Sequence, residues 1–277
     1  MVSEEGLNAY GAVTWGQFFI YQGFNENCGW MHTSSQADVA DLYAEKIQDS
    51  AGQLMYQYDN ALRKVQQKDI RITVQENGVK STKKFTAFFT HHGPVMAKRN
   101  DRWLTLKHHN RSAKGLEQSW LRTKVKNFAG FQQLMAMKEN TSNNTVYADK
   151  EGNIGYWHGN FMPRRNPQYD WSQPVDGTTS ATEWQGLHEP AEMVTIINPA
   201  NGWLQNCNAT PFTAAGTASP NRSNFPTYMA PDAENYRGIN AVNVWRNAQV
   251  LTIDKVIAGG YTRKLPAFDD MIRSEER

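Results

Sequence analysis

A chain of 277 residues, of which 39% are hydrophobic, is long enough to bury a sizeable core. Its formal net charge is only +2 and its Lys and Arg residues are scattered, so the basic surface of a nucleic-acid-binding protein is not expected. No apolar run reaches the roughly 18 residues of a membrane span, the first residues lack the regions of a signal peptide, and two cysteines do not make a disulfide framework.

The first third of the chain is predicted to be mostly β, within a single domain over residues 1–277. Glycines break residues 10–33 into short β-prone runs such as Gln17–Tyr21, which favours strands joined by tight turns. Farther along, Arg71–Val74 and Phe85–Phe89 flank a Glu-Asn-Gly turn at residues 76–78, a pattern typical of a β-hairpin.

Gln118–Lys138 is predicted to form one amphipathic helix. Its apolar residues recur at three- and four-residue spacing, and they are Leu121, Val125, Phe128, Phe131, Leu134 and Met135. This spacing places them on one face of a helix, which would cover a sheet.

The second half of the chain returns to strands and ends in helices. Strands are predicted over Thr145–Ala148 and Ile154–His158, and a Pro- and Gly-rich loop over Pro163–Pro190. From Glu234 onward the apolar spacing is helical, with Thr252 as a candidate N-cap. This order of elements predicts an α+β fold rather than alternating βα units.

Short motifs in the sequence carry little chemistry. The adjacent pair His91 and His92 is interpreted as surface or turn histidines, because neighbours on a strand point to opposite faces and cannot easily chelate one metal. The segment Asp38–Asp41 has a spacing that can wrap Ca²⁺, but the spacing alone favours the capping aspartates of a helix N-terminus. No Gly-rich phosphate loop, G-x-S-x-G elbow or HExxH motif occurs.

Three longer patterns resemble the penicillin acylase family. The first is GFNENCGWMHTSS at residues 23–35, followed by Asp38, Asp41, Tyr43 and Glu45. The second is YADKEGNIGY at residues 147–156, and the third is NPANGWLQNCNATP at residues 198–211. They occur in the family's order and at compatible spacings, and the resemblance covers about residues 6–255.

The resemblance implies an N-terminal-nucleophile hydrolase with an αββα sandwich of antiparallel sheets, here incomplete. In such enzymes a Ser at the β-chain N-terminus attacks an amide, with its own α-amino group as the base. The residues that match the family's oxyanion site are the Ser34 N–H and the Asn208 side-chain amide, and Arg237 matches an Arg that braces the amide.

The resemblance also assigns a substrate pocket and a metal site. Trp120 matches an aromatic residue of the acyl pocket, while Gln22, His32 and Asn143 stand where phenylacetyl-preferring members have apolar or small residues, which argues against a plain benzylic pocket. Asp38, the Ala40 carbonyl and Asp41 match calcium ligands, although a later Asp ligand falls near Ser219. A structural Ca²⁺ and no organic cofactor are expected.

The expected function is hydrolysis of a linear amide in an N-acylated small molecule, such as a β-lactam or an acyl-homoserine lactone. By the resemblance, the nucleophilic Ser should precede Gly6 by some tens of residues, so we expect this chain alone to be inactive. Its expected partners are the α-chain and the upstream β-chain segment of a parent enzyme, and its expected location is the periplasm or outside the cell. The alternative is a non-catalytic binding or structural relative that keeps the fold and a calcium site.

Overall fold

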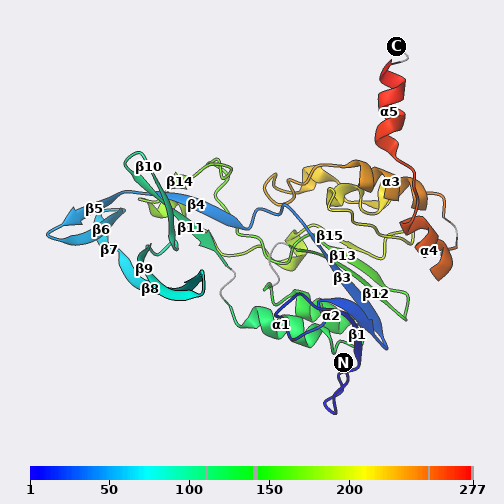
Figure 1. Cartoon of the computed structure of the whole chain (residues 1–277). Coiled ribbons are helices and arrows are strands. Elements are labelled where there is room, and N and C mark those ends of the chain that lie inside the picture. The colour runs from blue at the N-terminus through cyan, green and yellow to red at the C-terminus, as the bar shows by residue number, and fades with distance from the viewer. Residues whose placement is uncertain (110–111, 140–142, 249, 276–277) are drawn as a thin grey trace. The chain divides into compact units, whose positions relative to one another are not determined.

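The computed structural model of the chain describes residues 1–109, 112–139, 143–248 and 250–275 (Figure 1). The chain divides into two compact units. The first comprises Met1–Asp38, Ser112–Met162 and His188–Arg277, and the second comprises Val39–Arg111 and Pro163–Leu187. That residues 1–277 form a single domain stays a prediction.

The first unit contains a six-stranded antiparallel sheet with the order β1-β2-β3-β12-β13-β15. The bounds of these strands are Ala9–Ala12, Gln22–Asn25, Cys28–Ser34, Asn143–Asp149, Ile154–Trp157 and Thr195–Ile197. In the central pair, Asn143 lies opposite Ser34 and Asn144 opposite Thr33. The two strands predicted around residue 150 are therefore confirmed.

Both faces of this sheet are covered, because successive side chains of a strand point to opposite faces. Helices α1 (Lys114–Arg122) and α2 (Phe128–Met135) lie along one face, as Figure 1 shows. The core on that side consists of Leu7, Ala9, Ile20, Cys28, Trp30, Val125, Phe131, Leu134, Met135, Tyr147 and Trp157. On the other face Tyr156, Ile196, Ala214 and Ala215 pack together next to the short 3-10 helices η3 (Pro211–Thr213) and η4 (Gly216–Ala218).

The single helix predicted over Gln118–Lys138 is wrong, since two helices occupy this segment. Asn127 caps α2, and its side chain accepts the N–H of Gly130 at 2.9 Å. In the break, the Asn25 side chain donates to the carbonyls of Thr123 at 3.3 Å and Val125 at 2.8 Å. These bonds use carbonyls that a continuous helix would need, so a tertiary contact overrides the local periodicity.

The strand predicted over Gln17–Tyr21 is also wrong, because residues 13–21 turn between β1 and β2. Phe19 and Ile20 are both buried, at 2% and 4% exposure. Neighbouring residues on an extended strand point to opposite sides, so a turn that sends both into the core is the better solution here.

The second unit contains three smaller sheets. One is four-stranded with the order β10-β11-β4-β14, in which β14 runs parallel to β4. Its strands are Val95–Arg99, Arg102–His108, Ala40–Glu45 and Val175–Asp176. A three-stranded sheet consists of β5, β6 and β7, at Ile47–Ser50, Gln53–Tyr58 and Ala61–Lys64.

The predicted hairpin is confirmed as β8 (Gln66–Glu76) and β9 (Val79–Phe89). Its two-residue turn consists of Asn77 and Gly78, with φ of 50° and 80°. Positive φ at both positions is the geometry that Asn-Gly adopts most readily, and it matches the twist of the flanking strands.

The described part of the chain ends in three helices, α3 (Tyr236–Trp245), α4 (Ile253–Gly260) and α5 (Pro266–Glu275). Thr252 caps α4 as predicted, with its hydroxyl accepting the N–H of Lys255 at 3.3 Å. Within the described ranges, no helix is long and apolar enough to cross a membrane. The α+β class with mostly antiparallel sheets is confirmed, and the face-to-face packing of two sheets stays a prediction.

Candidate active site

Asn208 lies in the loop after β15 and contacts both other residues of the predicted oxyanion site. Its Nδ2 donates to the Ser34 carbonyl at 2.9 Å, and its Oδ1 accepts from Arg237 Nη1 at 3.3 Å and Nη2 at 3.2 Å. Its φ is 55°, a left-handed conformation that Asn tolerates better than most residues. All three residues belong to the first unit.

The forked contact with Arg237 fixes the orientation of the Asn208 amide. A guanidinium has only donors, so it selects the amide oxygen and turns the NH₂ group toward Ser34. The NH₂ group carries two hydrogens, and the Ser34 carbonyl takes one of them. Among the described residues no acceptor takes the other hydrogen, so it can donate to a negatively charged oxygen, and the positive charge of Arg237 on the far side of the amide strengthens that bond.

The loop of Asn208 is tied to the sheet by Asn206. The Asn206 Oδ1 accepts the backbone N–H of Asn208 at 3.0 Å, the Thr33 hydroxyl at 2.5 Å and the Asn144 amide at 3.3 Å. Thr33 is on β3 and Asn144 on β12, so one side chain links the loop to two neighbouring strands. The position of Asn208 therefore depends on the centre of the sheet.

A buried polar chain extends this support. The Tyr156 hydroxyl donates to Asn144 Oδ1 at 2.9 Å and lies 3.3 Å from His158 Nδ1, and His158 Nε2 lies 3.2 Å from Asp232 Oδ2. Burial, followed by the charge of Asp232, raises the pKa of Tyr156 well above its usual value, so its hydroxyl keeps its proton. Asp232 also accepts the Gln36 N–H at 2.9 Å, just beyond β3.

Sequence reasoning missed the supporting roles of Asn206, Asn144, Tyr156, His158 and Asp232. Asn206 and Tyr156 lie inside the long patterns at residues 198–211 and 147–156, so their presence there was a usable signal. His158 and Asp232 are 74 positions apart and carry no local motif. Only the fold brings them together.

Two of the predicted pocket residues lie around Tyr21. The Tyr21 and His32 rings are 4.8 Å apart, and the Asn143 amide donates to the Tyr21 hydroxyl at 2.5 Å. The two others lie elsewhere in the first unit. Gln22 is exposed on β2, and Trp120 lies on α1 with its ring 6.0 Å from that of Phe18.

Arg122, at the end of α1, is a buried cation that the sequence did not single out. It is 3% exposed, and its Nε and Nη2 have no hydrogen-bond partner among the described residues. Burial lowers the pKa of Arg122 to about 10, although the electrostatic interaction with Tyr21 acts to raise it. Burial, and then the charge of Arg122, lowers the pKa of His32 well below its usual value, so His32 is neutral at pH 7.

Asp41, one of the residues matched to a calcium site, is paired through Oδ2, whereas its buried Oδ1 has no hydrogen-bond partner among the described residues. Asp41 Oδ2 accepts from Arg165 Nε at 2.8 Å and from the Trp184 indole N–H at 2.5 Å, and both members of the Asp41–Arg165 pair are buried. The guanidinium already supplies the positive charge that a carboxylate needs when it is buried. Asp38 belongs to the first unit, whereas Ala40 and Asp41 begin β4 in the second.

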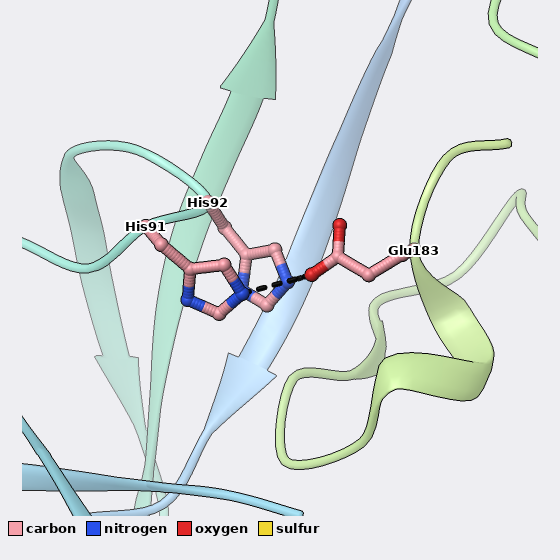
Figure 2. A group of neighbouring side chains, drawn as sticks. All are labelled: His91, His92 and Glu183. Carbon is pink, nitrogen blue, oxygen red and sulfur yellow. Dashed lines mark hydrogen bonds and ion pairs between the residues drawn. The ribbon is translucent and has the colours of Figure 1, made fainter. Parts of the chain in front are cut away.

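His91 and His92 are turn histidines as predicted, because residues 90–93 form a turn between β9 and β10, closed by paired backbone bonds between Thr90 and Gly93. The expectation that the two side chains point apart is wrong, since it applies to neighbours on a strand. The two imidazole rings lie 3.9 Å apart, and both point toward Glu183, as Figure 2 shows.

Comparisons with known proteins relate this arrangement to one family. The penicillin amidase family model matches residues 2–269. Over 220 residues the chain is 32% identical to penicillin G acylase of Escherichia coli. This match covers 74% of the present chain and 25% of the relative. Among solved structures, thermostable penicillin G acylase from Alcaligenes faecalis superposes on this chain with a TM-score of 0.77 and 26% sequence identity. The superposition covers 93% of this chain and 45% of the Alcaligenes chain. The chain thus spans about a quarter of the length of the curated relative that it matches.

Proposed function

The chain belongs to the penicillin amidase family, and from this premise we propose that it supplies the oxyanion-stabilising part of an enzyme that hydrolyses a linear amide in an N-acylated small molecule. The family consists of amidohydrolases. The observation that carries the proposal is the fixed orientation of the Asn208 amide between Arg237 and Ser34.

In this reaction a nucleophile attacks the amide carbonyl, and the carbonyl oxygen becomes an oxyanion. The second N–H of Asn208 and the backbone N–H of Ser34 are the donors that we assign to that oxygen, and Arg237 holds the amide in place. Because these donors are already oriented before the reaction, they stabilise the developing negative charge without having to reorient during it.

We propose that the nucleophilic Ser comes from the upstream β-chain segment and that an α-chain completes the pocket. The residues that we assign to the oxyanion site do not include a nucleophile, and the proposal takes the attacking Ser from that upstream segment. We therefore expect no turnover by this chain without those partners. The periplasmic or secreted location implied by the family stays a prediction.

The acyl group of the substrate is proposed to carry an oxygen acceptor. Tyr21, His32 and Asn143 offer polar atoms in the segment that the resemblance assigns to the acyl pocket, and Arg122 is a buried cation whose charge acts on two of them. A bare phenyl ring would leave His32 Nε2 and the Arg122 Nε and Nη2, which have no hydrogen-bond partner among the described residues, unpaired, which costs free energy. A β-lactam side chain or a homoserine-lactone acyl chain with an oxygen substituent fits better.

The first prediction concerns Asn208→Asp in the complete enzyme that contains this chain. The substitution keeps the shape and the contact with Arg237 but removes both N–H donors, so we expect kcat for an N-acyl substrate to fall about 10²–10³-fold with little change in KM. Steady-state hydrolysis measures this. The matched control is Asn224→Asp, the same change at an exposed position, which should leave kcat unaltered.

One observation favours the alternative of a non-catalytic relative. The Asn208 amide already donates to the Ser34 carbonyl, as a purely structural Asn would. If that is its role, the parent protein shows no turnover of N-acyl substrates, and Asn208→Asp lowers only the melting temperature. Hydrolysis by this chain alone that survives Asn208→Asp would show that other groups perform the chemistry.

A further inference from the structure

We propose that His91, His92 and Glu183 form a site for a divalent transition-metal ion of the zinc type. The site lies within the second unit and is independent of the proposed hydrolase function. His91 and His92 are in the turn between β9 and β10, and Glu183 follows the 3-10 helix η1 (Ser180–Thr182). The three possible ligand atoms all lie within 4.8 Å of one another.

The two histidines converge on a single oxygen. His91 Nε2 lies 2.8 Å and His92 Nε2 lies 3.0 Å from Glu183 Oε1. Dashed lines mark both contacts in Figure 2. Zn²⁺ binds N and O ligands at roughly 2.0–2.1 Å, which places tetrahedral ligands about 3.3 Å apart. The two His–Glu distances are therefore a few tenths of an ångström short of that spacing, and outward movement of the Glu183 carboxylate would lengthen both.

Each imidazole is also held from behind, as metal-binding histidines generally are. His91 Nδ1 lies 3.1 Å from the Tyr56 hydroxyl, and His92 Nδ1 lies 2.7 Å from Glu45 Oε1. Glu45 is itself fixed, since its Oε1 accepts hydroxyls of Thr90 at 2.7 Å and Thr105 at 2.9 Å. Such outer partners orient the ring and leave the other nitrogen for the metal.

The turn that carries the histidines is fixed by packing. A Cβ on Gly93 would lie 2.1 Å from the Leu106 carbonyl oxygen on β11, so only glycine lets the turn approach that strand so closely. The His92 ring stacks on Tyr43 of β4 with centroids 3.7 Å apart. The ligands are thus positioned before any ion binds.

Charge and access favour a cation at this position. Glu183 pairs with the Lys107 ammonium, whose Nζ lies 2.5 Å from Oε2, while the neighbouring Glu45 carboxylate accepts from His92 and the hydroxyls of Thr90 and Thr105. Lys107 occupies the other oxygen of Glu183, while Oε1, which also accepts the Tyr58 hydroxyl at 3.2 Å, faces both imidazoles. The side chains of His91 and Glu183 are 27% and 26% exposed, so an ion and a bound water can reach the site from solvent. Two imidazoles and one carboxylate suit Zn²⁺ better than Ca²⁺, which prefers oxygen ligands.

The test is titration of the metal-free full chain with Zn²⁺, followed by calorimetry and thermal melting. We expect one ion per chain and a melting temperature that rises with Zn²⁺. Tyr56→Phe keeps the buried ring but removes the outer partner of His91, so it should weaken binding about 10–100-fold. His91→Ala and Glu183→Gln, which each remove a ligand, should weaken it at least about as much. His109→Ala, a histidine outside the cluster, is the control and should bind like the parent chain.

The competing explanation is a purely structural cluster of hydrogen bonds. In that case Tyr56→Phe and His91→Ala lower the melting temperature equally with and without Zn²⁺, and calorimetry shows no uptake by the parent chain. Either result overturns the proposal, as does uptake that His91→Ala leaves unchanged. Because His91 lies at the exposed edge, His91→Ala decides the question even if Glu183→Gln fails to fold.

Discussion

Arg122 lies at the end of α1 with 3% of its surface exposed. Among the residues that the structure describes, no carboxylate lies within ion-pair distance of it, and two of its nitrogens have no hydrogen-bond partner. A buried charge without a partner is destabilising, and proteins keep such groups mainly where they serve a ligand. The unpaired buried charge of Arg122 is therefore the basis for proposing that the acyl group of the substrate is polar.

Arg122→Met tests this interpretation through stability. Removing buried polar atoms that have no partner should raise the free energy of unfolding by about 1–3 kcal/mol, measured by urea denaturation. Arg246→Met, at an exposed position at the end of α3, should change it by less than about 0.5 kcal/mol. A loss of stability in Arg122→Met would mean that the guanidinium is held by favourable contacts, and the assignment to substrate would fail.

For strand β4, the family resemblance and the structure give different partners to Asp41. The resemblance implies that Asp38, Ala40 and Asp41 bind Ca²⁺, whereas Asp41 forms a buried ion pair with Arg165. A metal ion that binds only the folded state raises its stability by mass action. Thermal melting therefore distinguishes the two arrangements.

We expect the melting temperature to be the same in millimolar Ca²⁺ and in chelator, because Arg165 already neutralises Asp41. Asp38→Ala should then change the melting temperature by the same amount in Ca²⁺ and in chelator. A Ca²⁺-dependent rise that Asp38→Ala abolishes would instead support the calcium site of the family.

At the scale of the whole molecule, the last helices leave apolar side chains in solvent. On α4, Ile253, Val256 and Ile257 are 80%, 47% and 53% exposed, and their three- and four-residue spacing places them on one face. On α5, Phe268 and Ile272 are each 57% exposed. Clustered exposed apolar residues of this kind mark surfaces that associate with other protein.

We therefore expect the isolated chain to self-associate at micromolar concentrations, as measured by sedimentation velocity. Ile253→Glu combined with Ile257→Glu should shift the population toward monomer, because a charged residue is costly to bury in an apolar contact. Ile72→Glu, at a half-exposed position on β8, is the control. A parent chain that stays monomeric at these concentrations would rule out the interpretation.

What the sequence determined by itself was local. The spacing of Phe131, Leu134 and Met135 predicted one buried helix face, Asn77-Gly78 predicted the hairpin, and Thr252 predicted a helix start. Each follows from contacts within a few residues, where periodicity and turn chemistry act directly. The family resemblance added Asn208, Ser34 and Arg237 as candidate site residues, and the family model matches residues 2–269.

Only the tertiary structure decided which atoms meet. Asn25 breaks the predicted helix from about 100 residues away, and Glu183 reaches His91 across 92 positions. The structure also shows that Asn208 contacts Ser34 through its carbonyl and that Asp232 supports the site through His158. No local pattern encodes such contacts, because a hydrogen bond between distant segments depends on the path of the whole chain. Burial makes these hydrogen bonds stronger than they would be in water.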